Sequence, residues 1–275
     1  MDTDSLTTMI VGEHIVEHPA LSQNRGAPLI RFRDVSVPNA AGQNAISDAT
    51  FDVVSGEIYG VAGVGGNGQT ELAGAIMGPT TPTKGQVEIV GIADLTHDSP
   101  TKRRRDGVAS IPVDRYKHGL AVRQTILENF AIAGTMRGKF GSWFRFRKSA
   151  ARSKAKEAIA NFDVQGVRSV NQRASLLSGG NARKLVIARE FGGDQKIVLA
   201  HSPSRGLDVR AGAAVHDRLR AARDAGAAVI LISEDLDEIL LLADRIGVLN
   251  RGRIAAEFTA PAQRADIGQA MVSHG

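Results

Sequence analysis

The segment GVAGVGGNGQTELAGAI, from Gly60 to Ile76, decides the fold of this chain. A short apolar run leads into a cluster of glycines, and the residues after it have helical spacing up to Gly78, a typical helix stop. A loop between a buried strand and a helix N-terminus directs backbone N–H groups toward one point, where the helix dipole adds positive potential. The segment therefore predicts a strand, a phosphate-binding loop and a helix.

The glycine spacing fits the phosphate-loop pattern G-x-x-x-x-G-K-[ST] except at the lysine. Gly63, Gly68 and Thr70 match, whereas Gln69 stands at the lysine position. Loss of a charged hydrogen bond costs about 1.5–3 kcal/mol, which weakens nucleotide binding without preventing it. On this segment alone, a strand-to-helix turn without a ligand is an equal alternative. The candidate nucleotide-binding residues are Gly63, Val64, Gly65, Gly66, Asn67, Gly68, Gln69, Thr70 and Glu71.

Length and composition limit the classes of protein to consider. The chain has 275 residues, 43% of them hydrophobic, which suffices for one large domain or two small ones. Its apolar runs, such as AAVILI at Ala227–Ile232, are shorter than the ~18 residues that span a bilayer. The acidic start MDTDSLTTMIVGEH does not have the pattern of a signal peptide. Cysteine is absent, which excludes disulfides and thiol chemistry and fits a cytosolic protein.

The charge balance gives a weaker signal. A net charge of +5 permits nucleic acid, anionic lipid or phosphate ligands, but aromatic residues make up only 4% and argue against base stacking. We therefore expect no nucleic-acid partner. The run TKRRR (Thr101–Arg105) is typical of a solvated helix face. The run WFRFRK (Trp143–Lys148) alternates aromatic and charged residues, which fits a surface contact or local packing.

Strand patterns alternate with helix patterns along most of the chain. IRFRDVSV and ATFDVV predict an antiparallel hairpin layer, and RIGVLNRGRIAAEF predicts a closing hairpin. From about Leu120 to Arg189 the spacing is mostly helical. Strands that alternate with helices predict an α/β core with a largely parallel sheet, into which this helical stretch is inserted. The expected core strands lie at Ile58–Ala62, Gly107–Pro112, Lys196–Ala200 and Ala227–Ile232.

A second anion-binding pattern lies in LLSGGNARKLVIARE, Leu176–Glu190. Ser178 and two glycines precede a helix, whose first N–H groups can contact a phosphate. The segment resembles the signature motif of the ATP-binding-cassette (ABC) ATPases, in the LSGGN form of sugar and nucleoside importers. In that family the loop reaches across a dimer to the partner's nucleotide. The matching residues are Leu177, Ser178, Gly179, Gly180 and Asn181.

Other segments resemble the same family in the expected order. GVASIPVDRYKHGL is similar to the Q-loop region, IVLAHSPSRGLDVRAG to Walker B and the D-loop with Asp208, and LISEDLDEIL to the switch region. The resemblance covers about Leu29 to Phe258 and implies a RecA-like P-loop core, an antiparallel β layer and a helical subdomain. We expect a linker or tail at 1–28, the cassette at 29–260 with its helical subdomain at about 119–190, and a C-terminal tail at 261–275.

Several positions depart from the family's pattern. Gln69 replaces the Walker A lysine, and Val113 stands at the Q-loop position. His201 and Ser202 stand where the family has the Walker B carboxylates for Mg²⁺ and for activating water. We therefore expect no catalytic residue, no hydrolysis through this chain's own Walker motifs, and weak or absent Mg²⁺ at Thr70.

Two further departures concern single side chains. Glu234 stands at the switch-histidine position, where its charge would oppose a γ-phosphate. Its place in SEDLDE also predicts a role at the start of a helix. His201 has no second ligand beside it at metal-binding spacing, so we do not expect it to bind a metal.

The resemblance implies a nucleotide-binding subunit or half-subunit of an ABC importer for a sugar or nucleoside. GNGQTEL is similar to the second, degenerate cassette of the nucleoside type, so we expect a complete cassette and membrane permease subunits as partners, and a solute-binding protein indirectly. The expected cofactors are ATP and Mg²⁺, and the expected place is cytoplasmic, peripheral on the inner face of the plasma membrane. Two alternatives stay open: a non-transport ABC protein of translation or DNA repair, and a non-functional remnant.

Overall fold

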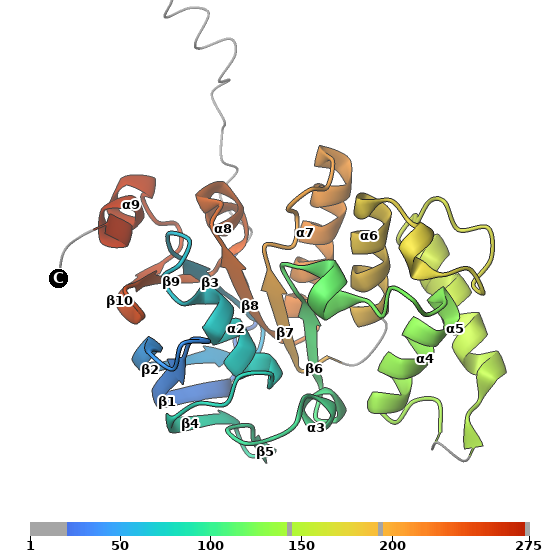
Figure 1. Cartoon of the computed structure of the whole chain (residues 1–275). Helices are drawn as coiled ribbons and strands as arrows, with labels where there is room; N and C mark the ends of the chain where they lie inside the picture. The colour runs from blue at the N-terminus through green and yellow to red at the C-terminus, as the bar shows by residue number, and fades with distance from the viewer. Residues whose placement is uncertain (1–20, 142–144, 192–194, 273–275) are drawn as a thin grey trace, which may run out of the picture.

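The computed structural model describes residues 21–141, 145–191 and 195–272, and their fold is α/β (Figure 1). Strands form a four-stranded antiparallel sheet, ordered β2-β1-β4-β5, and a six-stranded sheet, ordered β10-β9-β3-β8-β7-β6. The strands are β1 (Pro28–Pro38), β2 (Asn44–Val54), β3 (Glu57–Ala62), β4 (Lys84–Ile89), β5 (Ala93–Asp94), β6 (Val108–Ile111), β7 (Ile197–His201), β8 (Ala228–Ser233), β9 (Arg245–Asn250) and β10 (Arg253–Thr259). The helices are α2 (Gln69–Met77), α3 (Pro100–Arg105), α4 (Ile126–Met136), α5 (Lys148–Asn161), α6 (Gly179–Glu190), α7 (Val209–Asp224), α8 (Leu236–Leu242) and α9 (Arg264–Val272).

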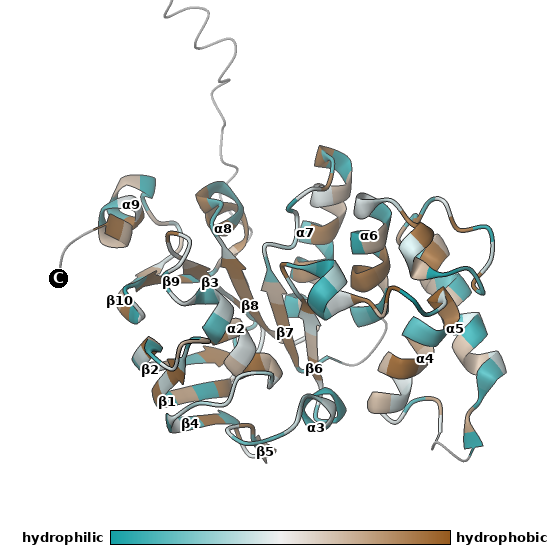
Figure 2. Cartoon of the chain, viewed as in Figure 1, coloured by the Kyte–Doolittle hydropathy of each residue, from teal (hydrophilic) through white to brown (hydrophobic). Residues whose placement is uncertain are grey.

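The six-stranded sheet is the core that the apolar runs predict. Strands β9, β3, β8, β7 and β6 pair in parallel, and β10 closes the sheet antiparallel to β9. Every residue of β3, β6, β7 and β8 is buried, and Figure 2 shows continuous hydrophobic colour along β7 and β8. Parallel strands are covered by helices on both faces, which is why their sequences show apolar runs rather than alternation.

The antiparallel sheet packs beside the core through aromatic side chains. Phe32 on β1 pairs with Phe51 on β2, and their rings stack with centroids 4.4 Å apart. Phe51 in turn stacks on Tyr59 of β3 at 5.2 Å. The predicted hairpin layer is therefore confirmed, and aromatic stacking joins it to the strand that leads into the phosphate loop.

The predicted helical stretch is confirmed as α4, α5 and α6, which share an apolar cluster of their own. A capping box starts α4, with the Thr125 hydroxyl accepting from the Glu128 N–H and the Glu128 carboxylate accepting from the Thr125 N–H. Leu185 on α6 is fully buried in this cluster, together with Ile126 of α4. No helix among the described residues is long and apolar enough to cross a membrane.

The run TKRRR forms helix α3 as predicted, but a fully solvated face is wrong for it. Arg103 is 1% exposed and donates hydrogen bonds to the carbonyls of Ala75, Ile76, Leu95 and Asp98. Two of those carbonyls close the last turn of α2, where a helix has no internal donor left. Burial lowers the pKa of Arg103 to about 10.

The run WFRFRK shows packing where it is described. The Phe146 ring meets the Phe140 ring edge-on at a centroid distance of 6.4 Å, although Phe146 is still 39% exposed. Trp143 lies outside the described residues. The described part of the run thus includes local packing at the end of the loop between α4 and α5.

Replacing Arg103 by methionine should destabilise the protein by about 2–4 kcal/mol, because several buried carbonyls lose their donor. Urea unfolding of Arg103→Met, with Arg105→Met on the same helix as control, measures this. Arg105 is exposed, so its variant should stay within about 0.5 kcal/mol of the wild type. Equal losses in both variants would contradict the structural role of Arg103.

Candidate functional site

The phosphate loop, residues 63–68, joins buried β3 to the start of α2, as the opening segment predicts. Gly68 precedes α2 with φ 105°, and a Cβ placed there would lie 2.5 Å from the Ala45 carbonyl oxygen. Only glycine fits that conformation and that contact. Gly65 and Gly66 are exposed, so the outer side of the loop is open to a ligand.

Asn67 fastens the loop to the hairpin of β9 and β10. Its side-chain amide donates to the Leu249 carbonyl at 3.4 Å, and its side-chain oxygen accepts from the Arg251 N–H at 3.3 Å. Its backbone carbonyl accepts from the Gly252 N–H at 3.2 Å. These three hydrogen bonds hold the loop against the hairpin.

Gln69, at the lysine position, lies against the loop rather than in solvent. It is 5% exposed, and its side-chain Nε2 donates to the Val64 carbonyl at 2.9 Å. A Cβ placed on Gly63 would lie 2.9 Å from the same Nε2. The side chain thus supports the loop from within and brings no positive charge to it.

Glu234 brings a negative charge to the same loop from the end of β8. A Cβ placed on Gly65 would lie 2.8 Å from the Glu234 carboxylate oxygen Oε1. The predicted helix-start role of Glu234 is wrong, because Asp235 caps α8 and accepts from the Asp237 and Glu238 N–H groups. Asp235 occupies the N-cap position, whereas Glu234 precedes it and its carboxylate lies against the phosphate loop.

His201 is the last residue of β7, and Ser202 follows it. His201 is 8% exposed, and burial followed by the charges of Arg183 and Arg205 lowers its pKa to about 4. Ser202 is 7% exposed with φ 46°, and its N–H donates to the Ile232 carbonyl at 2.8 Å. The ABC family that the sequence resembles has carboxylates at these two positions. This chain has the neutral imidazole of His201 and the hydroxyl of Ser202, whose backbone N–H is hydrogen-bonded to Ile232.

Arg183 on α6 was not among the residues singled out from the sequence, yet it connects the site. It is 2% exposed and donates to the Val113 carbonyl at 2.7 Å and to the Ser202 carbonyl at 2.9 Å. A longer bond of 3.3 Å reaches the Pro203 carbonyl. Arg183 therefore ties the helix after the signature loop to the Q-loop position and to the end of β7.

The signature residues form the start of α6, as predicted. Ser178 is the exposed N-cap residue, and its hydroxyl accepts from the Asn181 amide at 2.9 Å. The Asn181 side-chain oxygen accepts from the Gln165 N–H at 2.8 Å, which fixes the loop. In Figure 1, α6 lies with α4 and α5, while α2 lies against the sheets. The chain's own signature loop and phosphate loop therefore lie on different parts of the molecule.

The predicted D-loop residue Asp208 lies at the start of α7, next to the exposed Val209. The Asp208 carboxylate caps α7 by accepting from the Ala211 N–H at 2.8 Å. Val209 is 92% exposed and Leu176, next to the signature, is 72% exposed. Leu176 thus adjoins the signature loop, which in the ABC family that the sequence resembles reaches a partner, and Val209 adjoins the D-loop position Asp208.

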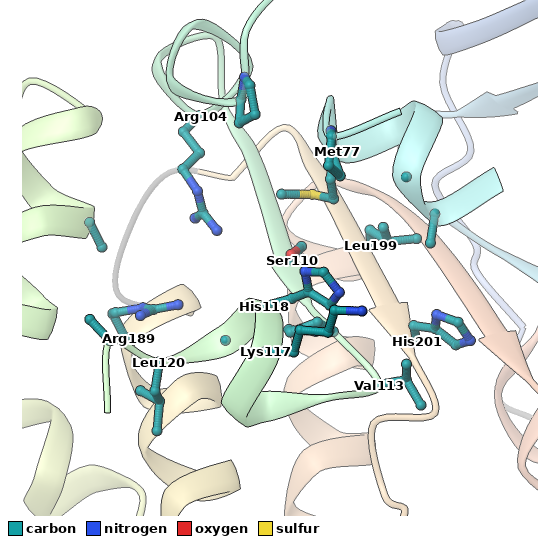
Figure 3. Close-up of a pocket in the computed structure, with 18 of the residues that line it drawn as sticks. Met77, Arg104, Ser110, Val113, Lys117, His118, Leu120, Arg189, Leu199 and His201 are labelled. Carbon is teal, nitrogen blue, oxygen red and sulfur yellow. The ribbon is translucent and has the colours of Figure 1, made fainter. Parts of the chain in front are cut away.

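A cavity of about 500 Å³ lies beside the phosphate loop, between α2, the segment after β6, and α4 (Figure 3). Thr70, Val113 and His201 all line it. Figure 3 shows Val113 and His201 together at one end, and Arg104 and Arg189 at the other. The structure thus brings Thr70 of the phosphate-loop segment, the Q-loop position Val113 and His201 to one cavity.

The segments that form this site also identify the protein family. The sequence model of the family described as ABC transporter matches residues 46–205. The chain belongs to the ABC transporter ATP-binding cassette family. The matched range includes the phosphate loop, the signature loop and the end of β7, so the resemblance drawn from the motifs is confirmed at the level of the family.

Curated relatives include import ATP-binding proteins for sugars and nucleosides. The chain is 38% identical to the glucose import ATP-binding protein TsgD13 of Haloferax volcanii, over 91% of this chain and 46% of that protein. It is 36% identical to the nucleoside import ATP-binding protein NupA of Lactococcus lactis, over 90% of this chain and 49% of that protein. The chain thus spans about half the length of the curated relatives it matches.

Solved structures share the fold. A structure titled as the ATP binding subunit of an ABC transporter matches with a TM-score of 0.74 at 23% identity, over 89% of this chain and all (100%) of that one. A bacterial ABC transporter cassette in a dimeric structure matches with a TM-score of 0.72 at 22% identity, over 86% of this chain and 100% of that one. The RecA-like α/β fold class is confirmed.

Removing the charge of Glu234 should strengthen nucleotide binding, because its carboxylate lies against the loop that would receive phosphate. We expect Glu234→Gln to raise ATP affinity about tenfold, the order expected for removing one like charge near a partly exposed anion. Equilibrium titration with a fluorescent ATP analogue measures this, with Asp237→Asn as the control on α8. An unchanged or weaker affinity in Glu234→Gln would refute the electrostatic role.

The depressed pKa of His201 makes stability depend on pH. In the unfolded chain His201 takes up a proton near pH 6.5, whereas in the folded state it does so only near pH 4. The stability that the neutral imidazole contributes is therefore fully present above pH 6.5 and is lost as the pH falls toward 4. Between pH 7 and pH 5, the free energy of unfolding should therefore fall by about 2 kcal/mol less in His201→Asn than in the wild type. Urea unfolding of both proteins at the two pH values gives the difference, and parallel pH curves would show that His201 does not contribute.

Proposed function

We propose that this chain is a nucleotide-binding subunit or half-subunit of an ABC importer for a sugar or nucleoside, and that it completes the ATP site of a partner cassette. One observation carries the proposal. The signature loop at Ser178 is intact and exposed, while the chain's own phosphate loop has Gln69 and Glu234 where a lysine and a histidine would serve a nucleotide. The names of the relatives supply the solute class.

The described residues fit weak binding of ATP at the chain's own loop. Gly65, Gly66 and the Thr70 hydroxyl are exposed, so phosphate oxygens can reach N–H groups at the start of α2. The residues do not fit Mg²⁺ in the same way. His201 replaces the carboxylate on the metal side, and the positive charges of Arg183 and Arg205 act on it. We therefore assign ATP to this loop with weak Mg²⁺ or none.

Hydrolysis at this loop has no general base. A serine orients and polarises water poorly compared with a carboxylate. The backbone of Ser202 is moreover committed, its N–H to Ile232 and its carbonyl to Arg183. The site residues assigned here are the loop residues 63–71 for nucleotide, 177–181 for the signature acting in trans, and Asp208 for the D-loop, with no catalytic group.

The partners follow from the faces that these elements present. A complete cassette would face the signature loop, with Leu176 and Val209 covered in that contact. Membrane permease subunits, and indirectly a solute-binding protein, would complete the importer, with this chain cytoplasmic and peripheral on the inner face of the plasma membrane. The boundaries that we propose are a linker or tail at 1–28, the cassette at 29–260 with a helical subdomain at about 119–190, and a C-terminal tail at 261–275.

Ser178→Arg should abolish the ATPase stimulation that this chain gives to a complete cassette of a sugar or nucleoside importer, because a large cation replaces the small cap beside the partner's phosphate. The matched control is Ser175→Arg, an exposed serine in the turn just before the signature. Steady-state phosphate release is measured for the complete cassette alone and with each form of this chain. We expect a difference of about a hundredfold or more between the two variants, the order found when one transition-state donor is lost.

Two outcomes would contradict the proposal. One is robust ATP turnover by this chain alone, after removal of contaminating ATPases. The other is stimulation of the complete cassette that Ser178→Arg leaves intact.

A further inference from the structure

The cavity beside the phosphate loop has mostly apolar walls. Its volume of about 500 Å³ lies in the range of roughly 300–1,000 Å³ that is typical of small-molecule sites. Met77 of α2, Ile132 of α4 and Leu199 of β7 contribute to the walls. Figure 3 shows Met77 and Leu199 between the His201 end and the Arg104 end. A ligand with an apolar body would therefore have contacts along most of the cavity.

The charged groups that line this cavity are all basic. Arg104, Lys117 and Arg189 are among the lining residues, together with His118 and His201, and the lining residues include no aspartate or glutamate. In Figure 3 the side chains of Arg104 and Arg189 extend toward the same end of the cavity. That end of the cavity is therefore a place where an anion would be favoured.

Among the described residues, three arginines at this end share one carboxylate. Behind the wall, the Glu190 carboxylate accepts from Arg104 at 2.7 Å, from Arg137 at 2.6 Å and from Arg189 at 2.9 Å. Burial alone would raise the pKa of Glu190, but these arginines lower it to about 2. Within the described part of the chain, one carboxylate therefore faces three guanidinium groups, and every side chain of this cluster is 12% exposed or less.

The surplus positive charge is directed at the cavity through Arg104. Among the hydrogen bonds of the described residues, Arg104 uses only Nη1, which donates to Glu190. Its other guanidinium nitrogens are available to a ligand. Burying surplus charge is costly unless a counter-charge and hydrogen bonds compensate it, so an anion bound there would relieve an existing penalty.

We propose that this cavity binds a small amphipathic anion, with its single acidic head group on Arg104 and Arg189 and its apolar body along Met77, Ile132 and Leu199. The head group is a carboxylate, sulfonate or phosphate, because all three accept hydrogen bonds from a guanidinium. The site is separate from the phosphate loop, although Thr70 and His201 line the opposite part of the cavity. The proposal does not depend on the importer assignment.

The probe for this site is 8-anilinonaphthalene-1-sulfonate, an aromatic body with one sulfonate, and the matched neutral probe is N-phenyl-1-naphthylamine. Fluorescence titration of the full chain should show saturable binding of the anionic probe at one site. Arg104→Met should weaken the anionic probe about ten- to hundredfold, the range for losing one charged hydrogen bond, and should leave the neutral probe unchanged. Arg105→Met, an exposed neighbour on α3, should change neither.

A second variant tests the apolar part. Ile132 is 43% exposed at the cavity, so Ile132→Trp should be tolerated and should weaken both probes by narrowing the space. Thermal unfolding confirms that each variant is folded, and Arg104→Met still leaves Glu190 with Arg137 and Arg189. Lack of saturable binding by folded wild-type protein would overturn the proposal. So would an equal effect of Arg104→Met on both probes, or none from Ile132→Trp.

Discussion

The hydrogen bonds of Arg183 are the constraint on which the arrangement of this site depends. A fully buried guanidinium must be compensated by acceptors, and here backbone carbonyls of Val113, Ser202 and Pro203 provide them. These carbonyls belong to the segment after β6 and to the end of β7, whereas Arg183 itself lies on α6. Helix α6, the segment after β6 and the end of β7 therefore keep one relative placement, because moving any of them would leave a buried charge without partners.

The electrostatics of the phosphate side follow from that placement. Arg183 and Arg205 act on His201, where the family has a carboxylate, so the local charge at the end of β7 is positive instead of negative. At the phosphate loop, the carboxylate of Glu234 follows β8 and lies against Gly65. A carboxylate beside a cradle of N–H groups opposes a bound phosphate, and the binding prediction for Glu234→Gln rests on this opposition.

Continuous apolar runs and glycine positions were sufficient to predict much of the fold. Strands β3, β7 and β8 are recognisable because parallel strands are buried on both faces, and α2 is recognisable because Gly78 ends it with φ 95°. The burial and the partners of individual side chains were less predictable. Arg103 looks like a surface residue in TKRRR, and its burial depends on the end of α2, whose carbonyls lie 27 and 28 positions earlier in the chain. Sequence periodicity contains no signal for such a contact.

The candidate site shows the same division between local and tertiary information. The start of α6 at Ser178 could be predicted from local pattern, whereas the competition between Glu234 and Asp235 for the cap of α8 could not, because both are acidic and adjacent. Their roles separate only when the register of β8 directs Glu234 toward the phosphate loop.

The surroundings of Arg183 and of Arg104 differ, and the difference distinguishes a structural arginine from one that could bind a ligand. Arg183 is buried, and its two terminal nitrogens donate to backbone carbonyls of the protein itself, so its place is set by the fold. Arg104 shares one carboxylate with Arg137 and Arg189 and borders a cavity whose lining residues include no acid. A buried cation whose terminal nitrogens bond to backbone carbonyls maintains architecture, while one that shares its counter-ion and borders open space retains the capacity to bind an anion.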